Sequence, residues 1–217
     1  MKRIAITQRR VNIGEHQEVR DSLSDDWQAL AQHLGIALLP LPNRPEQALQ
    51  LLESQEVDGI VFSNGESLPL TNEGKLSEGD FAARDRTEQK LLHYAINTQL
   101  PVLGICRGCQ MIALHAGATL SIIEASQHIA KNHMVSMHFP GWCDSHREVN
   151  SYHRYGIQAD GAPTFDILAK DEELRIEAFK LPNHPVWGVL WHPERENWTH
   201  KSDDGFNHYL FAKVFNL

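Results

Sequence analysis

Short apolar runs alternate with amphipathic segments along the first half of the sequence. Within residues 22–35 the apolar positions recur at the three- and four-residue spacing of one helical face, and Gly35 follows as a helix stop. Pro45 occupies the first turn of a second such segment. The pattern predicts strands at 3–8, 36–42, 58–65 and 101–105, helices at 22–35, 45–56, about 80–98 and from 106 onward, and a loop at 66–79.

The order of these elements predicts the fold class. Alternating strands and helices indicate an α/β fold, an open, doubly wound, mostly parallel sheet with right-handed crossovers and helices on both faces. The second half is less regular, with strands predicted at 133–139, 147–157, 165–172, 176–182 and 186–194 and a closing helix at 203–215. The 217 residues contain no internal repeat and no low-complexity linker, so we expect one domain spanning residues 1–217.

Composition and charge exclude several classes of protein. No window approaches the roughly 18 consecutive apolar residues of a membrane span, and the start "MKRIAITQRR" lacks the apolar core of a signal peptide. The net charge of −8, without a block of Lys or Arg, argues against nucleic-acid or membrane-surface partners. We therefore expect a cytoplasmic protein, in which a few placed arginines could still hold a small anionic ligand.

The three cysteines, Cys106, Cys109 and Cys143, cannot all pair, and their spacing fits no disulfide framework. We expect reduced thiols. Cys106 and Cys109 form a C-x-x-C, which leaves a redox role open and with it a Cys106–Cys109 disulfide. A structural zinc site would need a second ligand pair at comparable spacing, and no H-E-x-x-H or H-x-x-E-H occurs, so we expect no metal and no cofactor.

Cys106 stands directly after an apolar strand and before a helix, flanked by Gly104 and Gly108. A sharp strand-to-helix turn lifts its central side chain out of the packed layers, and small neighbours let the two elements approach closely. The positive end of the helix favours a thiolate there. The pattern G-x-C-x-G thus predicts a nucleophile, with a buried cysteine at a tight packing point as the alternative; Cys109, one helical turn later, is expected to be core packing.

A nucleophilic cysteine needs a base, and the base needs an orienting group. His192 ends the apolar run "VWGVLW", and Glu194 follows two positions later, on the same side of an extended chain. Because the carboxyl ends of parallel strands meet at one edge of a sheet, His192 is expected beside Cys106. The alternative is a surface histidine beside a solvated glutamate.

Together, "GICRGCQ" and "WHPE" resemble the class I glutamine amidotransferase superfamily, and the arginine after the cysteine with "VNSYH" (149–153) is similar to its γ-glutamyl hydrolase branch. The resemblance covers nearly the whole chain. It implies a flavodoxin-like fold and a triad of Cys106, His192 and Glu194. An oxyanion hole is implied at the backbone N–H groups of Arg107 and Gly65, although Asn64-Gly65 stands where the family has Gly-Gly. The residues implied for the glutamyl half are Gln110, Ser151, Tyr152 and His153.

The N-terminal stretch at 18–27, together with residues 6–9 and 83–92, is similar to bacterial γ-glutamyl-CDP-amidate hydrolases. This resemblance implies release of glutamate and cytidine diphosphoramidate, used to decorate surface polysaccharide. A diphosphate needs cationic donors. Arg20 and Arg84 are the preferred pair among the candidates Arg9, Arg10, Arg20, Arg84 and Arg107.

Other functions stay open for this sequence. The γ-glutamyl amide could carry another amine, as in γ-glutamyl-GABA, or the chain could be a glutaminase subunit that supplies ammonia to a separate synthase. A catalytically idle binding module with the same pocket is a further alternative. The sequence is compatible with a homodimer but does not fix the oligomeric state, and it assigns no role to His138 or His146.

Overall fold

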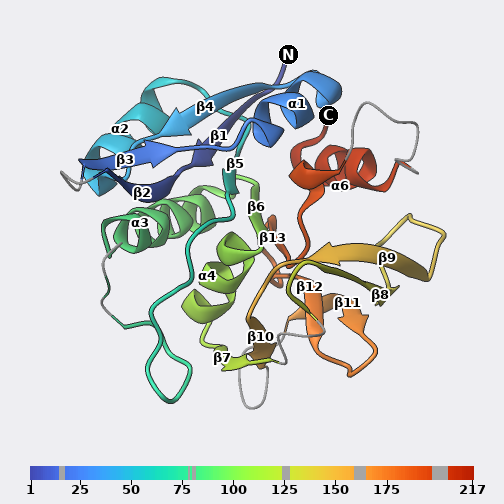
Figure 1. Cartoon of the computed structure of the whole chain (residues 1–217). Coiled ribbons are helices and arrows are strands. Elements are labelled where there is room, and N and C mark those ends of the chain that lie inside the picture. The colour runs from blue at the N-terminus through green and yellow to red at the C-terminus, as the bar shows by residue number, and fades with distance from the viewer. Residues whose placement is uncertain (15–17, 78, 80–81, 124–127, 159–164, 197–204) are drawn as a thin grey trace.

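The computed structural model describes residues 1–14, 18–77, 79, 82–123, 128–158, 165–196 and 205–217, and a single eleven-stranded sheet organises them (Figure 1). The strands of this sheet are β1 (Arg3–Thr7), β4 (Ala37–Leu41), β5 (Gly59–Phe62), β6 (Val102–Ile105), β7 (Thr119–Ile122), β8 (Lys131–Met137), β9 (His146–Ser151), β10 (Tyr155–Gln158), β11 (Asp166–Asp171), β12 (Ile176–Lys180) and β13 (Val186–Val189). Their order is β4-β1-β5-β6-β13-β12-β11-β8-β9, with β10 paired to β12 and β7.

Within the run β4-β1-β5-β6-β13, each pair of neighbouring strands is parallel. Counted along the chain, these strands stand in the order 2-1-3-4-5, which is the order of flavodoxin-like folds. The predicted α/β class is confirmed, and antiparallel strands from the second half extend the sheet beyond β13. In the pairing of β13 with β6, Val189 lies opposite Ile105, so the two strand ends that carry the sequence motifs are neighbours.

Helices cover both faces of the parallel strands (Figure 1). The helices are α1 (Asp26–Leu34), α2 (Pro45–Ser54), α3 (Ala82–Thr98), α4 (Arg107–His115) and α6 (Phe206–Phe215), and a 3-10 turn, η1, spans Pro193–Arg195. One core cluster joins α1 and α6 to Val61 and Leu103, whereas the other joins α2, α3 and α4 to Ile60 and Phe62. This division follows from the alternation of side chains along a strand, which sends neighbouring residues to opposite faces.

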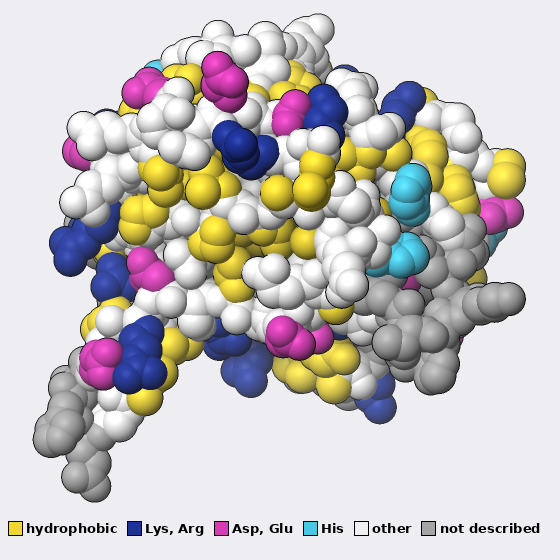
Figure 2. Space-filling view, turned by 90° about the horizontal axis from the view of Figure 1, so that it is seen from above, with side chains coloured by type: hydrophobic (Ala, Val, Ile, Leu, Met, Phe, Trp, Pro, Cys, Tyr) yellow, Lys and Arg dark blue, Asp and Glu magenta, His cyan; other side chains and the backbone are white. Residues whose placement is uncertain are grey.

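A two-stranded antiparallel hairpin of β2 (Arg9–Ile13) and β3 (Glu18–Ser22) was not among the predicted elements. Figures 1 and 2 show it as an arm that projects from the body, and Figure 2 shows basic, acidic and apolar side chains along it. Most of its residues are exposed, and Val19 retains 47% of its accessible surface. Without a buried face the hairpin lacks the apolar–polar alternation that identifies a strand in a sequence.

The second half also differs from the prediction in detail. The strand expected at 147–157 is two strands, β9 and β10, separated by residues 152–154, and β7 was not predicted. Residues 80–81 and 203–204, at the starts of two predicted helices, lie outside the described residues. Within the described part of the chain, no helix has the length and apolar character required to span a membrane.

Candidate active site

Cys106 occupies the corner between β6 and α4 in a conformation that side-chain-bearing residues rarely adopt, with φ 49° and ψ −101°. Its backbone N–H donates to the carbonyl of Val189 on β13 at 2.8 Å, and its carbonyl accepts from the N–H of Gln110 at 3.0 Å. These bonds fix the corner from both elements. Cys106 is 8% exposed, so its thiol is largely shielded from solvent.

The flanking glycines allow α4 to pack directly on the sheet. A Cβ on Gly104 would lie 2.7 Å from the backbone nitrogen of Cys109, and one on Gly108 would lie 2.1 Å from the carbonyl oxygen of Phe62. Both distances are shorter than van der Waals contact with backbone atoms. Glycine at these two positions is therefore required for the approach of α4 to β5 and β6.

His192 follows β13, and the structure brings it together with Glu194. The imidazole Nδ1 lies 2.7 Å from Oε1 of Glu194, and both side chains are buried. Asn150 fixes the backbone of His192, because its amide oxygen accepts from the His192 N–H at 2.8 Å and its amide group donates to the His192 carbonyl at 2.9 Å. Sequence analysis did not identify Asn150.

His192 lies close enough to Cys106 for the sulfur to affect the imidazole. Burial alone would lower the pKa of the imidazole, but interactions with Cys106 and with the hydrogen-bonded Glu194 carboxylate outweigh burial and raise this pKa to about 9. Among the described residues, Nε2 of His192 makes no hydrogen bond of ordinary geometry. Because Nδ1 is held by Glu194, Nε2 is the nitrogen left for exchanging a proton with the sulfur or with a bound substrate.

Asn64 is a second residue of the site that sequence analysis did not assign. Its amide group donates to Oε1 of Glu194 at 2.7 Å, and its amide oxygen accepts from the indole N–H of Trp27 at 3.4 Å. The indole can only donate, which fixes the orientation of the amide. Through these bonds Asn64 ties the turn after β5 to the carboxylate that contacts His192.

The turn after β5 contains Gly65, the residue expected to contribute to an oxyanion hole. Gly65 has φ 156°, and a Cβ there would lie 2.4 Å from Nη1 of Arg84 and 3.0 Å from Cβ of Arg9. Arg107, the other expected contributor, is the first residue of α4. The turn is thus packed between the first strand of the hairpin and a buried guanidinium.

Two arginines and three carboxylates form a buried charge network beneath this turn. Arg84 donates from Nε to Glu88 and from Nη1 to Glu66, each at 2.9 Å. Arg107 donates to Glu88 and Asp85. Burial alone would raise the pKa of Glu88, but the guanidiniums of Arg107 and Arg84 outweigh it and lower that pKa, so Glu88 is ionised inside the protein.

The network corrects the expectation for Arg84 as a contact of the substrate's leaving half. Arg84 is 0% exposed, and its Nη2 donates to the carbonyls of Ser63 at 2.7 Å and Asn64 at 3.1 Å. A guanidinium spread over these acceptors supports the turn and does not face a ligand. Arg20 lies on the exposed strand β3, and its Nε is 3.0 Å from Oε1 of Glu18. Its expected role as a contact of the substrate's leaving half stays a prediction.

Of the residues expected to hold the glutamyl half, Tyr152 contacts His192, whereas the polar groups of Gln110 and His153 contact protein atoms. Gln110 donates to the carbonyl of Tyr155 at 3.0 Å, and Nδ1 of His153 lies 3.2 Å from the same oxygen. The Tyr152 ring meets the His192 ring edge-on, with centroids 5.3 Å apart. Ser151 is buried. Their roles toward substrate stay predictions.

All three cysteines are free thiols in the structure. Cys109 is fully buried in the core, where burial, followed by the charges of Cys106 and Glu177, raises its pKa well above the ordinary value. A thiol in that state is a poor nucleophile and a poor redox partner. The burial agrees with the packing role expected for Cys109.

The chain is similar to known proteins over most of its length. A family model described as peptidase C26 matches residues 4–194. The chain is 31% identical over 196 residues to a γ-glutamyl-CDP-amidate hydrolase of Campylobacter jejuni subsp. jejuni, covering 89% of this chain and 90% of that protein. It is 28% identical over 165 residues to one subunit of the glutamine-hydrolysing GMP synthase of Methanocaldococcus jannaschii, covering 75% and 78%.

The fold has a counterpart among solved structures. The crystal structure of a Thermoplasma acidophilum protein, described as a GMP synthase subunit, superposes with a TM-score of 0.66 at 21% identity. The superposition covers 100% of this chain and 93% of the other. At this identity the match establishes the shared α/β fold.

Proposed function

This chain belongs to the peptidase C26 family and is a hydrolase of amide C–N bonds, and we propose that it cleaves a γ-glutamyl amide and releases L-glutamate. The family match confirms the resemblance carried by the cysteine and histidine motifs. The observation that carries the proposal is the corner at Cys106, which places a thiol at the end of β6 beside His192, an imidazole held by Glu194 at 2.7 Å.

In the first step, the Cys106 sulfur attacks the γ-carbonyl carbon, and the carbonyl π electrons move to the oxygen. The backbone N–H groups of Arg107 and Gly65 donate hydrogen bonds to the resulting oxyanion. His192, protonated on Nε2, gives its proton to the leaving nitrogen as the C–N bond breaks. The products of this step are a γ-glutamyl thioester on Cys106 and the free amine half.

In the second step, His192 takes a proton from water, and the hydroxide oxygen attacks the thioester carbon. The C–S bond then breaks, which releases glutamate and restores the Cys106 sulfur to its pair with His192. Glu194 holds the imidazole in one orientation throughout and stabilises its charged form. Gln110 and the 151–153 segment are the proposed contacts of the glutamyl α-amino and α-carboxylate groups.

We propose γ-glutamyl-CDP-amidate as the substrate, with cytidine diphosphoramidate as the leaving half. The 31% identity to a hydrolase of that name supports this choice. Arg9 lies against Gly65 and is exposed, so it is the arginine best placed to meet a diphosphate leaving the oxyanion turn. Arg20, on the partner strand of the same hairpin, is proposed as the second cation.

The experiment is a substrate panel with purified chain, in which free glutamate is measured for γ-glutamyl-CDP-amidate, γ-glutamyl-GABA, γ-glutamyl-p-nitroanilide and glutamine. We expect turnover with the nucleotide substrate, no turnover by Cys106→Ala, and normal turnover by Cys143→Ala, whose cysteine is free and exposed. Release of glutamate by Cys106→Ala would refute the assigned nucleophile. A preference for γ-glutamyl-GABA would keep the chemistry and replace the leaving group.

A second function is favoured by the matches to subunits of glutamine-hydrolysing GMP synthases. In that case the chain would hydrolyse glutamine and deliver ammonia to a separate synthase. The panel separates the two functions, because a subunit of this kind would act on glutamine and would be stimulated by its partner. Strong turnover of the nucleotide substrate by the isolated chain would exclude dependence on a partner.

A further inference from the structure

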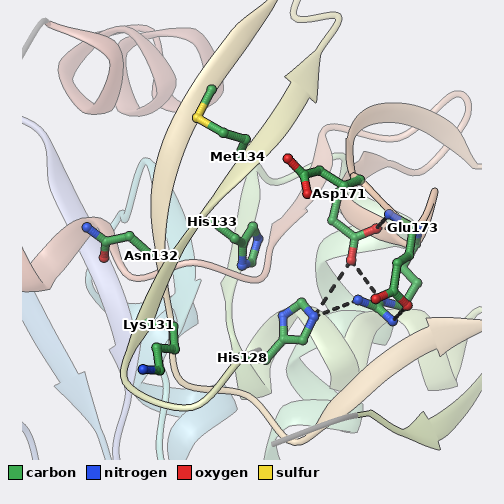
Figure 3. A pocket seen from close by; sticks show the side chains of 9 residues that line it. His128, Lys131, Asn132, His133, Met134, Asp171 and Glu173 are labelled. Atoms are coloured by element: carbon green, nitrogen blue, oxygen red, sulfur yellow. Dashed lines mark hydrogen bonds and ion pairs between the residues drawn. The ribbon is translucent and has the colours of Figure 1, made fainter. Parts of the chain in front are cut away.

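A cluster of histidines around one carboxylate lies outside the triad. It consists of His128, His133 on β8, His153 after β9, and Glu177 on β12. The ring centroid of His128 is 4.9 Å from that of His133 and 5.0 Å from that of His153. Figure 3 shows the rings of His128 and His133 converging beside a pocket. These residues come from separate segments, so the fold assembles the cluster.

In the part of the chain that the structure describes, several buried polar atoms of the cluster have no hydrogen-bond partner. Within the described residues, both ring nitrogens of His133, Nε2 of His153 and Oε2 of Glu177 are buried without a hydrogen-bond partner. His133 and His153 each bring Nε2 to 3.5 Å from a Glu177 oxygen, at the outer limit for such a bond. Unsatisfied groups of this kind are rare in protein interiors and need an explanation.

We propose that His128, His153 and Glu177 bind a divalent transition-metal ion of the Zn²⁺ type, with His133 completing the coordination. One ligand atom from each of the first three residues lies within 4.8 Å of the others. Imidazole nitrogens and one carboxylate are a usual ligand set for Zn²⁺. Sequence analysis expected no metal, because these ligands come from segments whose spacing matches no metal motif.

A cavity of about 380 Å³ adjoins the cluster on the side of His128 and His133, and Asp171 and Arg175 also line it (Figure 3). Arg175 competes for the site, because its Nη2 donates to Nε2 of His128 at 2.7 Å. A metal ion on that nitrogen would displace the guanidinium, which keeps Asp171 as a partner at 2.7 Å. Arg175 should therefore weaken metal binding, because its charge repels a cation and its guanidinium is hydrogen-bonded to one nitrogen of His128.

An ion in this position would tie β8 and β12 to the segment that carries Tyr152, whose ring contacts His192. The site lies beside the triad without containing any of its members. Its expected effect is to stabilise the fold and the substrate-facing segment, and it does not depend on the proposed substrate.

The test measures Zn²⁺ binding to chelator-treated full-length protein in the Cys106→Ala background, so that the nucleophile cannot supply a ligand. We expect one ion per chain by calorimetry and elemental analysis, and a higher unfolding temperature when Zn²⁺ is added. His153→Ala and Glu177→Gln should weaken binding on the order of 100-fold or more, whereas the exposed control His93→Ala should leave it unchanged.

Arg175→Gln provides a test that loss of folding cannot imitate. Removing the competing guanidinium should tighten binding on the order of tenfold, because a positive charge and an occupied ligand are lost together. Absence of stoichiometric Zn²⁺ binding in the background protein would overturn the proposal. Binding that His153→Ala and Glu177→Gln leave unchanged would assign the ion to surface histidines and would overturn it as well.

Discussion

Glu88→Gln is the sharpest test of how the oxyanion turn is supported. Glu88 is 0% exposed and accepts hydrogen bonds from Arg84 at 2.9 Å and from the hydroxyl of Thr7 at 2.8 Å, as well as from Arg107. The glutamine amide has the same shape as the carboxylate but no charge. Its NH2 group can only donate, and in either orientation this group faces a guanidinium, which also can only donate.

The expected loss of stability follows from the buried state of the pair. Breaking a buried ion pair by neutralising one partner costs about 3–5 kcal/mol, because the remaining charges stay buried without compensation. For a chain of 217 residues, this corresponds to a fall of roughly 6–20 °C in the unfolding midpoint. The measurement is thermal unfolding followed by circular dichroism at constant pH and salt.

Glu46→Gln is the matched control, since it makes the same change in a pair that is also anchored on α3. Glu46 is exposed and contacts Lys90 at 2.7 Å. Exposed pairs contribute little, so its midpoint should stay within about 2 °C of the parent protein. If Glu88→Gln shifted the midpoint no more than this control does, the buried network would not stabilise the fold and the reasoning would fail.

Four further predictions concern the triad and the residues that contact it. Asn64→Ala should lower kcat on the order of tenfold to hundredfold with a smaller change in KM, because Asn64 positions Glu194 without touching substrate; an effect confined to KM would contradict this. Glu194→Ala should cost less than His192→Ala in kcat, since the carboxylate orients and the imidazole transfers the proton; equal losses would argue against this division. The rate should fall as the pH rises through about 9, where His192 loses its proton. In Cys106→Ala, NMR titration should give a lower pKa for His192, because a nearby negative charge that favours the imidazolium is gone; an unchanged pKa would show that Cys106 does not act on the ring.

The parts of the site that are local in sequence could be predicted. Gly104, Cys106 and Gly108 lie within five consecutive positions, and their spacing alone specifies a sharp corner with close packing. His192 was found because it ends an apolar strand, and parallel strands bring their carboxyl ends to one edge. The same reasoning gave the order of strands and helices in the first half.

Partners distant in sequence could not be predicted in this way. Asn64 follows a strand and resembles an ordinary turn residue, and its bond to Glu194 exists only because the sheet brings β5 near the end of β13. Arg84 lies in a charged helix segment typical of a solvated face, and its burial depends on Glu66 and Glu88. The β2–β3 hairpin lacks a buried face, so its sequence does not show the alternation of apolar and polar residues that predicts a strand.

The insertion of β13 between β6 and β12 has a consequence for the newly made chain. Among the described strands, β13 comes last in the sequence, yet it is the inner neighbour of β6, the strand that precedes Cys106. A ribosome-bound fragment that ends before β13 therefore contains Cys106 but lacks His192. Under the proposed mechanism, such a fragment would be inactive until β13 enters the sheet.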